Sequence, residues 1–439
     1  MRDHRPTDSN RKKRVRTGAL VAAAALLALV ATAAVALAPS SGSDSSARDR
    51  NSDGRKTDSP KPRGSKAKRD SRKCDRTATS AGSLSSEFRA ASPGQTVCLA
   101  SGNYGSFRGG TKPGRVTVRA QPGASPSLSL DFDGARNIRI ADVTITEGVL
   151  TGETRNVTVD HSRFTGILVI DQTTPSPNIV LNRNTHNNIP GVADDYNSRV
   201  HLDAPGVVVK NSLFSGGTSD GIRVGNAPDT KILYNEFTAF VNKLPLHTDP
   251  IQFYGDGPRT TIRGNWFHDM VEVSAVIMMA DGGGPNVIEG NLFGPGGGHG
   301  FALTWYSDRG SIIRHNTFVN DDCNFNLPCG IINLGHKPGD SPGRGTVIRD
   351  NILTWIGADG NGEGGGVSSF SSSHNLFRSQ KPVGPGDVRG APNYAGTPIP
   401  PDAGRRQAFA AYRLARGSRG RRNASDGRDR GIRRASAPR

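Results

Sequence analysis

A short unit recurs through the middle of the chain at intervals of about 25 residues. In each copy, alternating apolar residues lead to Asn, one further residue, and an aromatic or aliphatic residue, as in Ile232 to Phe237. The copies end at positions 214, 237, 267, 293, 318, 353 and 377, which are 23, 30, 26, 25, 35 and 24 residues apart. A period of this length is typical of a repeat architecture, in which each unit buries its apolar face only by stacking on its neighbours.

A second apolar segment follows the Asn unit within most periods. Examples are Asp220–Val224, Asp249–Phe253 and Phe301–Trp305. These segments alternate with a period of two, which is typical of β-strands with one face inward, and clusters of Gly and Pro separate them. The sequence therefore predicts an all-β solenoid of about nine or ten coils whose short strands stack into parallel sheets, a parallel β-helix.

Stacking of the coils would bring the Asn of each unit above the Asn of the next. The clearest copies are Asn235, Asn265, Asn291 and Asn316. Asn tolerates a left-handed backbone at a tight corner, and its side chain can hydrogen-bond to the adjacent coil. We expect a vertical file of Asn side chains, with the phenylalanines of the unit filling the interior beneath it.

The basic residues are concentrated at the two ends of the chain. Residues 1–73 contain 18 Lys and Arg against 7 Asp, and residues 405–439 contain 12 Arg against 2 Asp. Removing both ends from the total charge of +17 leaves residues 74–404 with a net charge of −4. Since a nucleic-acid binder carries its basic patch on the folded domain, we expect no nucleic-acid partner.

Residues 1–38 are predicted to be a targeting segment. A basic leader precedes the charge-free stretch Ala19–Ala38, which is long enough to span a bilayer and would send the remainder across it. Ala36-Leu37-Ala38 fits a cleavage site, so the segment is either a signal peptide or an uncleaved membrane anchor. Residues 39–73 are predicted to be a disordered basic linker. The β-helix would then be secreted, or anchored to the plasma membrane and outside the cell.

Four cysteines are expected to pair in an exported chain. Cys323 and Cys329 are spaced to close a loop, and Cys74 and Cys98 would tie the first ordered residue to the first strand. A zinc site is not indicated, because the cysteines form no C-x-x-C pair.

The segment after Cys74 carries a specific resemblance. Ser83–Ala91 is predicted to be a short helix with Ser83 and Ser86 as candidate N-caps, and PGQTVCLASGNY follows at 93–104. This arrangement resembles the N-terminal cap and first coil of the pectate-lyase-like right-handed parallel β-helix superfamily. Residues 412–418 and 426–432 resemble the closing segment of its bacterial members.

The resemblance covers about residues 74–434. It implies a right-handed β-helix over 74–404, capped by the N-terminal helix, and a closing segment with an Arg-rich tail over 405–439. The density of arginine in that tail departs from the family pattern, so we expect it to be partly disordered. The resemblance implies no single reaction, because the superfamily includes lyases, hydrolases, epimerases and non-catalytic binders.

In β-helix proteins that act on glycans, the ligand lies across the outward face of a sheet. Leu246 to Gln252 resembles the H-x-D-x-I-Q segment of bacterial secreted β-helix proteins related to polysaccharide lyases. Arg223 and Gln252 are predicted to face outward on adjacent coils, with Tyr254 and Thr304 in the neighbouring outward column. On this alignment the later equivalents of Arg223 are apolar, namely Ile277 and Ala302.

The leading hypothesis is a monomeric polysaccharide lyase that cleaves an acidic glycan by β-elimination. This reaction needs a base for the proton beside the uronic carboxylate and a cationic or hydrogen-bonding group to neutralise that carboxylate. The candidate residues and their roles are Lys243 or His247 as the base, Arg223 and Gln252 as neutralisers, Tyr254 as proton donor, and Gln252, Thr304 and His299 as substrate-binding residues. If the lyase relies on Ca²⁺, Asp220 and Asp249 would be its oxygen ligands.

Two alternative functions remain open. A glycoside hydrolase on the same fold would use Asp220 and Asp249 as its two carboxylates, and a glycan- or cell-wall-binding module would have no catalysis. Structural roles also compete at each position, since Asp before Gly or Pro commonly caps a turn. His201 and Asp203 repeat the H-x-D spacing one or two coils earlier, so this spacing alone does not identify a catalytic pair.

Overall fold

The computed structural model describes residues 73–175, 177–189, 198–242, 247–319, 330–359, 364–400 and 402–433, which all belong to one compact unit. The predicted leader and linker, Lys243, and the Cys323–Cys329 pair lie outside these residues. Within the described ranges, no helix is long and apolar enough to cross a membrane.

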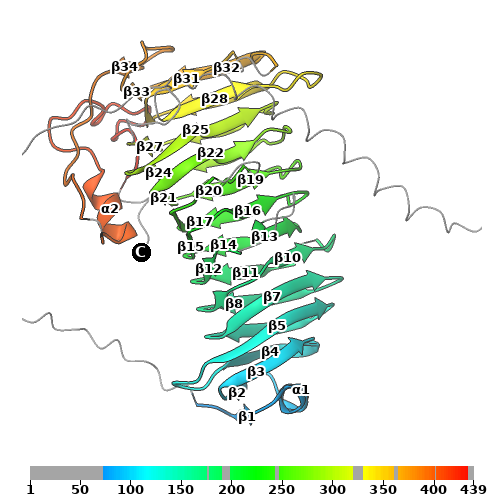
Figure 1. The fold of residues 1–439 in the computed structure, drawn as a ribbon. Helices are drawn as coiled ribbons and strands as arrows, with labels where there is room; N and C mark the ends of the chain where they lie inside the picture. Colours follow the sequence, from blue (N-terminus) through cyan, green and yellow to red (C-terminus); the bar gives the residue numbers. More distant parts are fainter. Residues whose placement is uncertain are drawn as a thin grey trace, which may run out of the picture. The chain divides into compact units, whose positions relative to one another are not determined.

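The chain winds into a parallel β-helix with three walls, and most coils contribute one strand to each wall (Figure 1). One wall is a 13-stranded sheet in the order β1 (Arg76–Ala78), β2 (Thr96–Leu99), β4 (Thr111–Ala120), β6 (Arg136–Ala141), β8 (Arg155–Asp160), β11 (Ile179–Asn182), β14 (Val208–Lys210), β17 (Lys231–Leu233), β20 (Thr261–Arg263), β23 (Val287–Glu289), β26 (Ile312–Arg314), β29 (Arg344–Arg349) and β32 (Ser369–Ser373). The prediction of nine or ten coils was too low, because the earliest coils carry no Asn unit.

The other two walls form one 21-stranded sheet, joined through β7. The second wall consists of β3 (Gly102–Phe107), β5 (Pro126–Asp133), β7 (Thr144–Thr151), β10 (Leu168–Asp171), β13 (Ser198–Asp203), β16 (Asp220–Val224), β19 (Ile251–Phe253), β22 (Met270–Met279), β25 (Gly297–Tyr306), β28 (Ile331–Gly335) and β31 (Trp355–Gly357). The third consists of β9 (Arg163–Phe164), β12 (Thr185–Asn187), β15 (Leu213–Ser215), β18 (Glu236–Thr238), β21 (Trp266–His268), β24 (Leu292–Phe293), β27 (Thr317–Phe318), β30 (Ile352–Leu353), β33 (Leu376–Phe377) and β34 (Val388–Arg389).

The predicted Asn file is confirmed at the corner between the first and third walls. The backbone N–H of Asn235 donates to Asn265 Oδ1 at 2.8 Å, and that of Asn265 donates to Asn291 Oδ1 at 2.9 Å. The file continues through Asn316, Asn351 and Asn375. The left-handed corner residue is not the Asn but the residue before it, for example Tyr234 at φ 57°. The Asn side chain is thereby free to satisfy the backbone of the adjacent coil.

The phenylalanines form the expected stack in the interior. Phe214, Phe237, Phe267, Phe293 and Phe318 lie with successive ring centroids 4.4–4.9 Å apart. His186 occupies one step of this stack, 4.5 Å from Phe164 and 4.3 Å from Phe214. Burial lowers the pKa of His186 to about 3, so this ring is neutral and packs as an aromatic residue.

The N-terminal end is covered by α1 (Ala81–Ala90), as predicted, but the N-cap is Ser80 rather than Ser83 or Ser86. The Ser80 hydroxyl accepts from the Ser83 N–H, and the Ser83 hydroxyl accepts from the Ser80 N–H, so the two serines form a reciprocal capping box. The predicted Cys74–Cys98 disulfide is present and joins the segment before β1 to β2.

The C-terminal segment packs against the β-helix rather than extending from it. Phe409 of α2 (Arg405–Ala411) lies in one apolar cluster with Trp266 and Leu292, which belong to the third wall. Arg430 is buried and donates to the Asn375 carbonyl at 2.8 Å. Residues 405–433 therefore pack against the β-helix, and the expectation of partial disorder stays untested for residues 434–439, which lie outside the described residues.

Candidate functional site

The outward face of the second wall carries a file of polar side chains on consecutive coils. His201 of β13 pairs in register with Arg223 of β16, and Arg223 pairs with Gln252 of β19. Their sequence neighbours Val200, Ile222 and Ile251 face the core. The structure confirms Arg223 and Gln252 as outward neighbours one coil apart. We call His201, Arg223 and Gln252 the polar file.

The file continues through residues other than those expected. Gln252 pairs with Met278, Met278 with Thr304, and Thr304 with Asn333. Thr304 therefore lies in the same column as Arg223 and not in the neighbouring one. Ile277, expected in this column, pairs with Ile251 on the core side. The pairing of β22 with β19 puts Met278 and not Ile277 beside Gln252, so the expected alignment was one residue off, and a slip of one residue exchanges the two faces of a strand.

Tyr254 joins the polar file through contacts with a coil two turns away. Its phenol donates to Asp203 Oδ2 and contacts His201 Nε2, while His201 Nε2 lies 3.0 Å from Asp203 Oδ2. The Arg223 guanidinium lies 5.0 Å from the centroid of the Tyr254 ring. These side chains come from three consecutive coils and form one connected group.

A glycine on the intervening coil makes this long reach possible. A Cβ at Gly225 would fall 2.1 Å from Asp203 Oδ1 and 2.4 Å from Tyr254 Oη. Any side chain at this position would separate the tyrosine from the aspartate. The backbone N–H after it, from Asn226, also donates to Asp203 Oδ1 at 2.9 Å and holds the carboxylate in place.

The electrostatics of this group fix its protonation. Burial, followed by the hydrogen bond to Asp203 and the charge of that carboxylate, raises the pKa of Tyr254 above its ordinary value. Burial alone would raise the pKa of Asp203, but its hydrogen bonds with His201 and Tyr254 lower it overall. At neutral pH the site therefore holds a protonated phenol beside an ionised carboxylate.

Asp220, His247 and Asp249 form a second cluster, at the start of strands β16 and β19. Asp220 Oδ1 accepts from the Asp249 N–H at 2.9 Å, and Asp249 Oδ1 accepts from the Ala275 N–H at 3.0 Å. The two aspartates thus bind the next coil and do not cap their own turns. Asp249 Oδ2 lies 3.5 Å from His247 Nδ1 and makes no hydrogen bond with any residue that the structure describes.

Both carboxyls of this cluster are buried. Burial raises the pKa of Asp220 and of Asp249, with the charge of Asp249 adding to the rise at Asp220, and each reaches about 7. The side chain of Asp249 has no exposed surface, so a sugar cannot reach it. This geometry does not suit the pair to the two-carboxylate role of a hydrolase, which must contact the scissile bond.

The cluster also fits calcium poorly. Asp220, His247 and Asp249 each offer one donor atom, and the three atoms lie within 4.8 Å of one another. Calcium takes six to eight oxygen ligands, whereas this set supplies two carboxylate oxygens and an imidazole nitrogen. We derive no step through calcium for this reason.

Two further predicted site residues are not placed by their side chains. Lys243 lies outside the described residues, and His299 of β25 is placed only by its backbone, which pairs with Val273 of β22. His201 and Asp203 were missed as site residues. Their repeated H-x-D spacing was the available signal, but it identified no partner, because Tyr254 lies 51 residues beyond Asp203.

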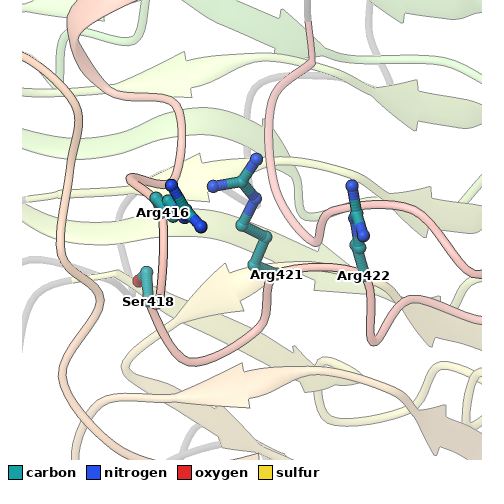
Figure 2. A pocket seen from close by; sticks show the side chains of 5 residues that line it. Arg416, Ser418, Arg421 and Arg422 are labelled. Atoms are coloured by element: carbon teal, nitrogen blue, oxygen red, sulfur yellow. The ribbon is translucent and has the colours of Figure 1, made fainter.

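A cavity of about 580 Å³ lies in the C-terminal segment, away from these residues in sequence. Arg416, Ser418, Arg421 and Arg422 line it together with Gly417, and Figure 2 shows the arginine side chains arranged around the hollow. The Ser418 hydroxyl is occupied, since it accepts from the Asn393 N–H at 2.8 Å. This lining offers positive charge and no carboxylate, so it lacks a group for acid–base chemistry near neutral pH.

Solved structures with a similar fold include several β-helix proteins. The PL6 family alginate lyase AlyGC aligns with a TM-score of 0.53 at 13% identity, over 82% of this chain and 57% of that one. Pectate lyase Pel9A aligns with a TM-score of 0.44 at 12% identity, over 80% of this chain and 92% of that one. A mutant tailspike protein of E. coli bacteriophage HK620, solved with a pentasaccharide, aligns with a TM-score of 0.37 at 10% identity, over 70% and 73%.

The likeness to AlyGC shows a shared fold and nothing further. The chain spans little more than half the length of AlyGC. No curated protein matches the sequence. A family model described as "Right handed beta helix region" matches residues 143–322 and 205–381. Because these matches together span residues 143–381, more than half of the 439 residues, the chain belongs to this right-handed β-helix family.

Proposed function

We propose that this protein is a carbohydrate-active enzyme that cleaves an acidic, uronic-acid-containing polysaccharide by β-elimination at the polar file. The observation that carries the proposal is the register of His201, Arg223 and Gln252 on consecutive coils, with Tyr254 bonded to His201 and Asp203. An alginate lyase among the structures of similar fold supports an acidic glycan as the substrate class.

The charges of the file suit a uronate carboxylate. Arg223 supplies a cation and Gln252 an amide that can donate to the carboxylate oxygens. Gln252 Oε1 is buried and accepts no hydrogen bond from any described residue. Neutralising the carboxylate makes the neighbouring C5 proton acidic enough for a side chain to remove.

The chemical step then needs one base and one acid. His201 takes the C5 proton, the C5–H electron pair forms the C4=C5 double bond, and the C4–O bond to the leaving sugar breaks. Tyr254 gives its phenolic proton to the leaving oxygen, and the proton held by His201 returns to Tyr254 through their direct contact. Asp203 contacts both side chains and stabilises the imidazolium.

The proposed base differs from the one expected from the sequence. His201 replaces His247 and Lys243 as the proposed base, because His201 touches Tyr254 whereas His247 faces the buried Asp249. Arg223, Gln252 and Tyr254 keep the roles expected of them.

We further propose that the β-helix works outside the cytoplasm, secreted or held at the membrane by residues 1–38. The Cys74–Cys98 disulfide supports an oxidising compartment. The substrate class supports the same location, since acidic polysaccharides are polymers of cell surfaces and surroundings.

The test is product formation by the purified full chain on alginate, pectate and glycosaminoglycans. Elimination creates an unsaturated uronide, so ultraviolet absorbance should rise with time. Tyr254→Phe should lower kcat/KM by about 100-fold or more, since it removes the proton donor and keeps the ring. Arg223→Gln should lower it by a similar factor.

Arg155→Gln is the matched control, because Arg155 is an exposed arginine on β8 of the first wall. It should leave the rate unchanged. Saturable binding of these glycans without any unsaturated product would overturn the lyase proposal in favour of a binding module. Hydrolytic products without the absorbance rise would overturn it in favour of a hydrolase.

A further inference from the structure

The carboxylates of Asp220 and Asp249, beside His247, are held in place by hydrogen bonds from the backbone, as metal-binding carboxylates commonly are. Each aspartate commits Oδ1 to a backbone N–H of the following coil, at 2.9 Å for Asp220 and 3.0 Å for Asp249. These bonds orient the carboxylates and leave Oδ2 of each one available. Ligating side chains are commonly oriented in this way by hydrogen bonds from the surrounding protein.

The free oxygen of Asp249 has no partner of its own. Its side chain has no exposed surface, and Oδ2 accepts no hydrogen bond from any described residue. A buried carboxylate oxygen without a donor is costly. Among the described residues, Arg223 is the nearest cation to the other carboxylate of the cluster. Its Nε lies 3.9 Å from Asp220 Oδ2, which is too long for a hydrogen bond.

The geometry points to a divalent cation as the missing partner. We propose that Asp220, His247 and Asp249 bind a transition-metal ion such as Mn²⁺ or Zn²⁺, in preference to calcium. Asp249 Oδ2 and His247 Nδ1 are 3.5 Å apart. Two atoms bound at about 2.1 Å to one tetrahedral ion would lie about 3.4 Å apart.

The donor types decide the class of ion. An imidazole nitrogen with two carboxylate oxygens suits Mn²⁺, Fe²⁺ and Zn²⁺, whereas calcium selects oxygen ligands in larger number. The two carboxylates are buried beside each other, so a cation held between them would offset the cost of placing like charges together away from water.

The site is open to solvent on one side only. The side chain of His247 is 50% exposed, whereas those of Asp220 and Asp249 are buried. An ion would enter beside the imidazole, and its remaining positions on that side would hold water. The proposal does not depend on the lyase proposal, because metal binding is measured directly and neither His201 nor Tyr254 takes part in it.

The experiment titrates the metal-free full chain with Mn²⁺, Zn²⁺ and Ca²⁺ separately, by calorimetry and by equilibrium dialysis with metal analysis. We expect one tight site for Mn²⁺ or Zn²⁺ per chain and weaker binding of Ca²⁺. His247→Ala should weaken the tight site by about 10- to 100-fold. Asp249→Asn should weaken it as well, and His247→Ala keeps the test decisive if that buried change unfolds the protein.

His161→Ala is the matched control. His161 is 47% exposed and lies 3.0 Å from Asp160, so it is a surface His–Asp pair without a second carboxylate. This variant should bind as the unaltered chain does. The proposal is overturned by the absence of a tight site, by Ca²⁺ binding at least as tightly as the transition metals, or by an equal loss in His161→Ala and His247→Ala.

Discussion

Replacing one residue of the Asn file should destabilise the β-helix severely. Asn265 lies at the centre of the file and is fully buried. Its Oδ1 accepts from the backbone N–H of Asn235 at 2.8 Å, and its Nδ2 donates to the Ile232 carbonyl at 2.9 Å. In Asn265→Ala the buried Asn235 N–H loses this acceptor, and the buried Ile232 carbonyl loses this donor.

The size of the effect follows from those two groups. Each unsatisfied buried backbone group costs about 1–3 kcal/mol, so Asn265→Ala should lower the free energy of unfolding by about 2–6 kcal/mol. Chemical denaturation followed by circular dichroism measures this loss, with the midpoint compared at an unchanged slope. The change also removes three buried heavy atoms, so the lost packing adds to the lost hydrogen bonds.

Asn226→Ala is the control for this measurement. Asn226 is exposed, and such a surface change should cost less than about 0.5 kcal/mol. If the two variants lose the same stability, the file does not stabilise the fold through its side-chain hydrogen bonds, and the reasoning is refuted.

Two further predictions concern positions whose side chain is set by a neighbouring coil. Gly225→Val should separate Tyr254 from Asp203 and lower kcat/KM of the unsaturated-product assay at least tenfold, with an unchanged circular dichroism spectrum; full activity would contradict the role of this glycine. His186→Phe should raise stability at acid pH. The folded pKa of His186 is about 3, below its unfolded value of about 6.5, so protonation favours the unfolded chain and stability falls as the pH drops from about 6.5 towards 3. The variant should lose this dependence, which denaturation at several pH values would reveal, and an unchanged pH profile would contradict the neutral stacked histidine.

The fold could be predicted because its signal is periodic and local. Every coil repeats the same requirement, a buried Asn that bonds the next coil and a Phe that stacks on the next ring, so the spacing alone places Asn235 above Asn265. The corner geometry was less accessible, because the left-handed residue before the Asn varies between Tyr234, Gly264 and His315.

The site could be predicted only where strands are regular. Arg223 and Gln252 follow directly from alternation in β16 and β19. Beyond them the pairing of β22 with β19 puts Met278 and not Ile277 in the outward column, and alternation alone does not fix that register.

The partnership of Tyr254 with His201 and Asp203 had no local signal at all. It spans two coils and depends on the missing side chain of Gly225 between them. Contacts of this kind depend on how the coils stack. In the sequence their only trace is Gly225, which looks like an ordinary turn glycine.

A crystal structure of the Tyr254→Phe variant soaked with an oligosaccharide of uronic acids tests the central claim most directly. One carboxylate of the sugar should lie between Arg223 and Gln252, with its C5 facing His201 and the glycosidic oxygen facing the ring of residue 254. An oligosaccharide bound elsewhere, for example at the arginine-lined cavity of Arg416, Arg421 and Arg422, with the polar file empty, would contradict it.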